Sequence, residues 1–116
     1  MLIGGGAVDE AELAAPIERG ICVTRFWYVN VVHEKQTLLT GMTRDGTFLI
    51  EDGRIGRPLR DVRFTDSVLR ILAATEALTA SQRLVAEADF YGRRYASGVF
   101  CQALRASGFR ITGQTV

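Results

Sequence analysis

Histidine and cysteine, the residues that most often hold a zinc ion, are scarce in this sequence. Its 116 residues include one histidine, His33, and two cysteines, Cys22 and Cys101. A zinc peptidase helix needs two histidines about one turn apart, so that both imidazoles face one metal, and His33 has no such neighbour. Nothing in the spacing of the cysteines supports a Cys–His metal site or a Cys–His nucleophile pair. We therefore expect an exposed turn at His33, buried and reduced cysteines, no metal site, no cofactor in this chain and no assignable catalytic residue.

An excess of basic charge and a long apolar run are also missing. Fourteen basic and thirteen acidic side chains leave a formal net charge of +1. Nucleic-acid binders usually carry a basic excess, so we expect no nucleic-acid partner, and we interpret the short arginine clusters around residues 54–63 and 93–94 as solvated surface. No apolar run approaches the ~20 residues needed to cross a bilayer, and residues 1–6 lack the basic start of a signal peptide. The sequence therefore predicts a cytoplasmic protein without a membrane partner.

The chain does contain strand-forming segments, of which residues 21–32 are the longest. This stretch, ICVTRFWYVNVV, is rich in β-branched and aromatic residues and has no proline or glycine. Both of its faces are largely apolar, which predicts a central strand covered on both sides. Arg25 is a polar exception that needs a partner. Because so small a domain covers such a strand with difficulty, we expect a homo-oligomer or a missing half that covers it.

Two Asp-Gly pairs predict how the following strands connect. We expect strands at 37–44 and 47–51, a hairpin turn at Asp45-Gly46 between them, and a second turn at Asp52-Gly53. Residues 54–64 predict one or two further short strands, with Pro58 at an edge or bend. This spacing indicates an antiparallel meander rather than a parallel βαβ sheet.

Helices are predicted on both sides of this meander. One runs from about residue 10 to 19, capped by Asp9 and ended by Gly20. The other runs through residues 68–78 after the capping segment 65–67. A loop at 91–94 and final strands at 99–104 and 109–112 complete a single α+β domain over residues 1–116, an antiparallel β meander with two flanking helices.

Three segments resemble a known family. Residues 20–30 are similar to the pattern G-x-x-V-T-R-x-W-Y, residues 40–53 to T-G-x-T-R-D-G-x-F-x-I-E-x-G, and residues 62–67 to L-R-F-T-x-S; residues 103–112 are similar to a closing strand. These are patterns of the TldD/PmbA proteins, related to zinc peptidases and long labelled modulators of DNA gyrase. The match spans nearly the whole chain in the right order. The resemblance marks four residues as structural members of the motifs, namely Arg25, Tyr28, Gly41 and Phe48.

The resemblance implies part of the C-terminal domain of a zinc-dependent peptidase that acts on peptides or unfolded segments, often as a pair of related subunits. In catalytic members an H-E-x-x-x-H helix in the preceding half and a cysteine shortly before the final strands hold the zinc. The helix motif is absent here, and the segment 86–94 contains no cysteine.

Two interpretations follow from this. In the first, the chain is a non-catalytic domain or truncated paralogue that supports dimerisation or peptide docking, with Thr43, Arg44, Asp45 and Gly46 at the rim of a peptide groove. In the second, it supplies part of an active metallopeptidase whose zinc motif lies on another polypeptide or in a missing N-terminal region. The expected partners are a second copy or a TldD/PmbA-family subunit, and a peptide substrate. A role in gyrase regulation rests on the family label alone.

Overall fold

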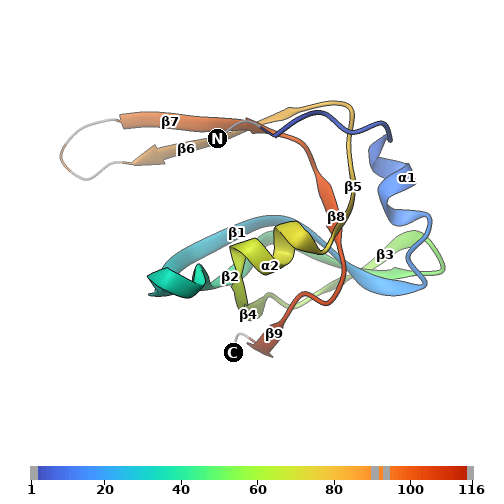
Figure 1. Ribbon diagram of the computed structural model, residues 1–116. Helices are drawn as coiled ribbons and strands as arrows, with labels where there is room; N and C mark the ends of the chain where they lie inside the picture. The colour runs from blue at the N-terminus through green and yellow to red at the C-terminus, as the bar shows by residue number, and fades with distance from the viewer. Residues whose placement is uncertain (1–2, 90–91, 93–94, 115–116) are drawn as a thin grey trace.

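Strands account for most of the chain in its computed structural model, which describes residues 3–89, 92 and 95–114 and gives only the backbone at 87–89 and 95–96 (Figure 1). The pairings between the named strands are antiparallel, which confirms the predicted α+β class with a β meander. The elements are α1 (Glu10–Ala14), β1 (Arg19–His33), the 3-10 turn η1 (Glu34–Gln36), β2 (Leu38–Glu51), β3 (Arg54–Leu59), β4 (Val62–Ser67), α2 (Val68–Ala73), β5 (Thr75–Leu78), β6 (Arg83–Asp89), β7 (Tyr95–Cys101), β8 (Leu104–Ala106) and β9 (Ile111–Gln114).

The main sheet is organised around β2 rather than β1. Its strand order is β1-β2-β4-β9, and β3 also pairs with β2. The first part of β2 pairs with β4 and the last part with β3, while β1 runs beside its whole length. The prediction that residues 21–32 form a central strand was therefore wrong, since β1 is an edge strand among the described residues. Apolar residues on both faces of a strand indicate that both faces pack against other parts of the protein. They do not indicate how many strands pair with it.

The predicted hairpin turn at Asp45-Gly46 is instead a β-bulge inside one continuous strand. On β1 the single residue Thr24 lies opposite both Asp45 and Gly46, whose φ angles are 60° and 132°. A Cβ on Gly46 would lie 2.8 Å from Thr24 Oγ1 and 2.8 Å from the Phe48 ring, so only glycine fits. An Asp-Gly pair readily adopts positive φ angles, and both a β-bulge and a hairpin turn need them. The local sequence therefore could not distinguish a bulge from a turn at this position.

The second Asp-Gly pair forms the turn that was predicted. Asp52 and Gly53, with φ angles of 48° and 75°, connect β2 to β3. Their backbone N–H groups donate to the carbonyls of Glu18 and Ile17 at distances of 2.9 and 2.8 Å, so the turn is tied to the start of β1. Pro58 lies in β3, which among the described strands pairs with β2 alone, in agreement with the predicted edge position.

Both helices are shorter than predicted. Asp9 caps α1 in a capping box with Glu12, as expected, but the helix ends at Ala14, ahead of Pro16, and Gly20 lies inside β1. Ser67 caps α2, which ends at Ala73, and residues 75–78 form β5 instead of continuing the helix. Pairing of β5 with β8 outweighs the helix propensity of this alanine-rich stretch. Of the predicted loop 91–94, only Gly92 lies within the described residues.

The buried apolar core is small. Its members are Leu13, Ala14, Leu49, Ile50 and Phe64. The Phe26, Phe64 and Phe109 rings extend it, with centroid distances of 4.9 to 5.7 Å. Many large apolar side chains of β1, α2 and the β6–β7 hairpin remain exposed. No helix in the described part of the chain is both long enough and apolar enough to cross a membrane.

Candidate functional site

A second bulge, on β1, brings two consecutive aromatic rings together. Tyr28 and Val29 together lie opposite Gly41, and Tyr28 has a φ angle of 52°. Consecutive side chains of a regular strand point to opposite faces, but this bulge breaks the alternation. The rings of Trp27 and Tyr28 consequently meet edge to face with centroids 4.2 Å apart. Asn30 Nδ2 donates to the Tyr28 carbonyl at 2.9 Å and supports this unusual backbone.

Three charged side chains lie next to the Trp27 ring. We call the set of Arg25, Trp27, Arg44 and Asp45 the arginine–tryptophan face. Arg25 and Arg44 are direct partners across β1 and β2, an arrangement of like charges that is unfavourable by itself. Asp45 Oδ2 lies 3.0 Å from Arg25 Nε, and the Arg44 guanidinium lies 4.0 Å from the Trp27 ring centroid. Arg25 thus has the partner that its apolar setting required. The Arg25–Asp45 contact is an ion pair rather than an aligned hydrogen bond.

Thr43, one of the predicted docking residues, points away from this face. Its side chain is fully buried, and its hydroxyl accepts from Val62 N at 3.0 Å and from Thr47 Oγ1 at 2.7 Å. The same hydroxyl donates to Asp61 Oδ1 at 3.3 Å. These contacts hold the turn before β4 against the bulge in β2. Thr43 therefore stabilises the bulge and has no access to a ligand in solution.

Two residues of the family motifs, Gly41 and Phe48, determine how closely side chains pack around the bulges. A Cβ on Gly41 would lie 2.8 Å from Phe64 Cε1 and 3.1 Å from Val29 Cγ2, so the absence of a side chain lets the core ring pack against the sheet. The Phe48 ring lies over Gly46. Both are packing contacts: the first brings β4 and Val29 of β1 against β2, and the second lies within β2 at its bulge.

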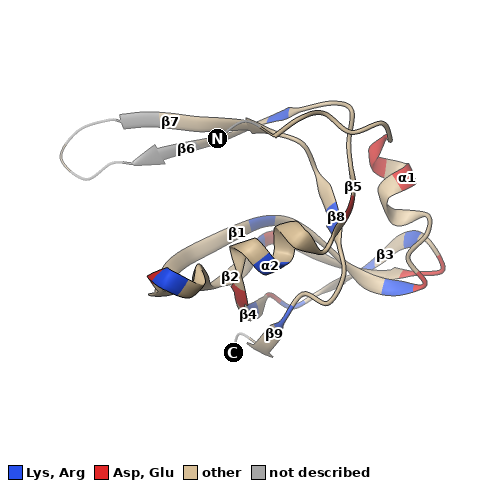
Figure 2. Cartoon of the chain, in the orientation of Figure 1, with Lys and Arg blue, Asp and Glu red and all other residues tan. Residues whose placement is uncertain are grey.

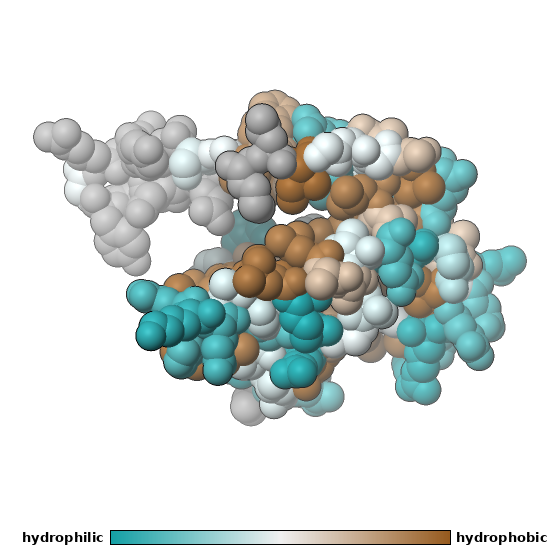
Figure 3. Space-filling model, viewed as in Figure 1, coloured by the Kyte–Doolittle hydropathy of each residue, from teal (hydrophilic) through white to brown (hydrophobic). Residues whose placement is uncertain are grey.

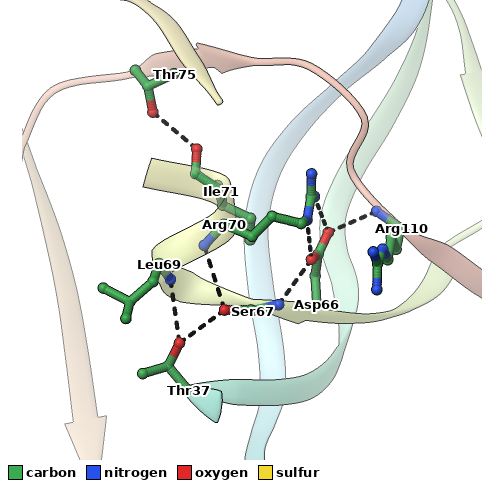
Figure 4. A network of polar contacts seen from close by, with 8 residues as sticks. All are labelled: Thr37, Asp66, Ser67, Leu69, Arg70, Ile71, Thr75 and Arg110. Carbon is green, nitrogen blue, oxygen red and sulfur yellow. Dashed lines mark hydrogen bonds and ion pairs between the residues drawn. The ribbon is translucent and has the colours of Figure 1, made fainter. Parts of the chain in front are cut away.

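Among the described carboxylates, Asp66 at the end of β4 has the most strongly shifted pKa (Figure 4). It is 1% exposed and is held by a two-point contact with Arg70, in which Arg70 Nε donates to Oδ1 at 2.6 Å. The backbone N–H groups of Ser67 and Arg110 donate to it at 2.8 and 2.9 Å. The hydrogen bond from Arg70, followed by the two backbone donors, outweighs burial and lowers the pKa of Asp66 to about 2. Since its oxygens are occupied and buried, Asp66 joins β4, α2 and the segment before β9 and is not an acid or base for a substrate.

The candidate metal ligands do not assemble. His33 is exposed, and its Nδ1 accepts from Gln36 N at 3.3 Å, which caps η1 and confirms the predicted polar turn. Cys22 and Cys101 are free and half-buried, and burial, followed by the charge of Glu10, raises the pKa of the Cys22 thiol. Within residues 3–89, 92 and 95–114, no group of three or more His, Cys, Asp or Glu side chains is arranged to hold a metal ion. The arrangement of these described donors therefore does not fit a zinc ion.

A surface cavity of about 420 Å³ lies between the glycine-rich start of the chain and β5. Its lining contains one ionisable side chain, Glu76, whose carboxylate accepts from Arg105 Nε at 2.9 Å. The cavity contains no pair of groups suited to acid–base chemistry.

The structure therefore brings together some of the predicted site residues and separates others. Arg44 and Asp45 meet Arg25 and Tyr28 around Trp27, on the exposed side of β1 and β2. Trp27 was not singled out from the sequence, although it lies inside the motif between Arg25 and Tyr28. The signal that could have identified it is its status as the single tryptophan of the chain.

Comparison with known proteins gives a consistent picture. The model of the family described as PmbA/TldA metallopeptidase C-terminal domain matches residues 1–113. The fold is similar to the crystal structure of TldE from Thermococcus kodakarensis, with a TM-score of 0.72 and 15% sequence identity, over 95% of this chain and 23% of that chain. No curated protein matches the chain. The chain therefore spans about a quarter of the length of this structural relative.

Proposed function

Because the chain belongs to the PmbA/TldA metallopeptidase C-terminal domain family, we propose that it is a non-catalytic part of a TldD/PmbA-type zinc peptidase. In this role it docks an extended peptide and supports assembly with a partner subunit. The peptide lies along the outer edge of β1, next to the arginine–tryptophan face. A zinc ion would be held by a catalytic partner and not by the described residues of this chain, and there it would supply the activation of water for peptide hydrolysis. The residues of this chain bind and orient the peptide.

The observation that carries this proposal is the open edge of β1. Among the described strands β1 pairs with β2 alone, so the backbone groups of its other edge face outward. From Arg19 to Trp27 the strand is regular, because the extra residue of the first bulge lies on β2. An extended peptide adds to such an edge by backbone hydrogen bonds, and neighbouring side chains select its sequence.

The side chains beside this edge suit a peptide. Arg44 presents guanidinium donors from a fixed position over the Trp27 ring, and donors of this kind bind carbonyl and carboxylate oxygens. Tyr28, which is 63% exposed and meets the Trp27 ring edge to face, offers an apolar contact next to it. Arg25 is already neutralised by Asp45, so Arg44 is the main recognition residue of the face.

Fluorescence of Trp27, the single tryptophan, provides the test. Addition of a synthetic peptide of extended, mixed polar and apolar sequence changes the emission, and the titration gives an affinity. Replacement of Arg44 by Ala removes one hydrogen bond to a charged group, so we expect the affinity to fall by about tenfold. Arg57→Ala, which removes an exposed arginine from β3, is the matched control and leaves the affinity unchanged. Equal affinities of the Arg44→Ala variant and the unmodified chain would remove Arg44 from the site.

A second candidate function follows from the short span of the match. Since the chain covers 23% of the TldE chain, an H-E-x-x-x-H helix on another polypeptide or in a preceding region would complete an active peptidase of which this chain is one part. Mixing the chain with a polypeptide that carries this helix then raises zinc-dependent proteolysis above that of either component. An unchanged rate in the mixture counts against this second function and leaves the docking role in place.

A further inference from the structure

The two faces of β1 differ chemically along the regular part of its open edge. Arg25 and Trp27 lie on one face together with Arg44, whose guanidinium is 4.0 Å from the Trp27 ring centroid. Phe26 lies between them in the sequence and points to the opposite face, where its ring centroid is 4.9 Å from that of Phe64. Because the pairing with β2 is regular from Arg25 to Trp27, this alternation of faces is strict.

The face with Trp27 carries a further arginine, Arg63 of β4. Trp27 is paired with Met42 across β1 and β2, and Met42 is paired with Arg63 across β2 and β4. Directly paired residues share one face of a sheet, so these three side chains form a row across the sheet. Arg44 and Arg63 are both exposed. One face therefore presents two guanidinium groups around an aromatic ring, and the other presents the apolar ring of Phe26.

The charges of Arg44 and Arg63 are not neutralised by any carboxylate among the described residues. The ion pairs within this part of the chain involve other arginines, namely Arg25, Arg70, Arg83 and Arg105. Asp45, the acid next to Arg44 in the sequence, is paired with Arg25. Elsewhere, basic and acidic positions are spread over most of the elements (Figure 2). Because charges are screened beyond about 8 Å at physiological ionic strength, these two arginines determine the potential at this face.

The open edge of β1 lies beside a hollow. Within the main sheet, β1 is the strand closest to the layer that contains β6 and β7 (Figure 1). The space-filling view shows the hollow between the sheet and this layer, with apolar surface on both of its sides (Figure 3). A carboxylate in partly apolar surroundings is unfavourable unless a basic group is its partner. An extended segment at this edge can therefore place acidic side chains towards the arginines, but not towards the opposite face.

We propose that the docked peptide is selected for a triplet of residues in the order acidic, apolar, acidic. In an extended chain paired with β1, the residue beside Phe26 places its side chain on the Phe26 face, and its two neighbours place theirs on the face of Arg25 and Trp27. An apolar side chain suits the first position. Carboxylates suit the two flanking positions, because Arg44 donates charge-assisted hydrogen bonds there and Arg63 adds attraction from the next strand. The inference rests on the proposed docking at β1 and names the class of peptide that docks.

Fluorescence anisotropy of short labelled peptides, titrated with the purified chain, tests this selection. The peptides share flanks of serine and threonine and differ in a central triplet, which is Glu-Leu-Glu, Gln-Leu-Gln or Glu-Glu-Leu. We expect the Glu-Leu-Glu peptide to bind about tenfold more tightly than Gln-Leu-Gln, because a hydrogen bond between charged groups replaces a weaker one. Glu-Glu-Leu has the same composition and net charge but directs one carboxylate to the Phe26 face, so it should also bind about tenfold more weakly.

Three variants locate the selection for acidic residues. Arg44→Ala should bind Glu-Leu-Glu and Gln-Leu-Gln with affinities within about twofold of each other, because the donor that distinguishes them is removed. Arg63→Gln should lower the preference to about threefold, because Arg63 lies on a more distant strand and acts through screened charge. Arg57→Ala on β3 is the matched control and keeps the tenfold preference. All three arginines are exposed, so circular dichroism should show an unchanged fold.

The outcomes separate this inference from the docking on which it rests. Equal affinities of Glu-Leu-Glu and Gln-Leu-Gln for the unmodified chain would overturn the selection and leave docking in place. A preference that survives Arg44→Ala would overturn it as well, because the acids would then be recognised elsewhere. Equal affinities of Glu-Glu-Leu and Glu-Leu-Glu would reduce the effect to net charge and also overturn it. If no peptide of the series binds, docking at β1 is itself contradicted and the selection falls with it.

Discussion

Replacing Asp66 by Asn removes the one carboxylate that holds β4, α2 and the segment before β9 together. The carboxylate is 1% exposed and receives hydrogen bonds from Arg70, Ser67 N and Arg110 N. An amide keeps one acceptor oxygen but turns an NH₂ group towards one of these donors. The variant therefore loses the ion pair and leaves at least one buried donor without a partner.

The magnitude follows from the pKa of Asp66, which is lowered from 3.8 to about 2. This difference between the folded and unfolded chains corresponds to a contribution on the order of 2 kcal/mol to the free energy of unfolding at neutral pH. For a domain of this size, the loss lowers the melting temperature by about 10 °C. Because the folded pKa is the lower one, the contribution is complete above the unfolded pKa of 3.8 and is lost as the pH falls towards 2.

Urea unfolding of the unmodified chain and of Asp66→Asn at pH 7 and at pH 2.5 measures this effect. The difference in unfolding free energy between the two proteins should be large at pH 7 and clearly smaller at pH 2.5. Asp52→Asn, an exposed turn residue with positive φ that asparagine also tolerates, is the matched control, and we expect a change within about 0.5 kcal/mol. A difference for Asp66→Asn that is small at pH 7, or the same at both pH values, would refute the reasoning.

Two further predictions concern packing and thiol chemistry. Gly41→Ala places a methyl group 2.8 Å from the Phe64 ring, so urea unfolding should show a loss of about 1–3 kcal/mol; an unchanged midpoint would mean that the ring moves aside freely. Burial raises the pKa of the Cys22 thiol, so in a Cys101→Ser background it should react with a disulfide reagent at pH 8 much more slowly in the folded chain than in denaturant. Equal rates in the two conditions would show that the thiol is accessible.

The meander could be predicted from the sequence because its signals are local. The length of β1, the turn at Asp52-Gly53, the edge position of Pro58 and the cap at Asp9 each depend on residues close together in the chain. The family membership likewise rests on contiguous motifs, which the family match over residues 1–113 confirms.

The remaining features depend on contacts between distant segments, which local patterns do not encode. Asp45-Gly46 has the same positive-φ chemistry in a bulge as in a turn, and only the partner strand decides between them. Residues 75–78 form β5 because β8 lies beside them. From the sequence, Asp66 was predicted to be part of the capping segment of a helix. Its hydrogen bond from Arg110 N could not be predicted, because that donor lies 44 residues further along the chain.

The candidate site was predicted in part. Arg44 and Asp45 do lie on an exposed face with Arg25, but Thr43 is buried beneath the bulge, since neighbouring strand residues point to opposite faces. The contact between Arg44 and Trp27 depends on the register of β1 against β2, which the two bulges set. That register is a property of the folded sheet and cannot be read from either strand alone.

Amide hydrogen exchange of the chain with and without a saturating extended peptide, in zinc-free buffer, tests the central claim most directly. The account predicts slower exchange at alternate amides from Arg19 to Trp27, because the added strand accepts hydrogen bonds along the outer edge of β1. Slower exchange confined to other strands, or no change at peptide concentrations that alter the Trp27 emission, would contradict peptide docking at this edge.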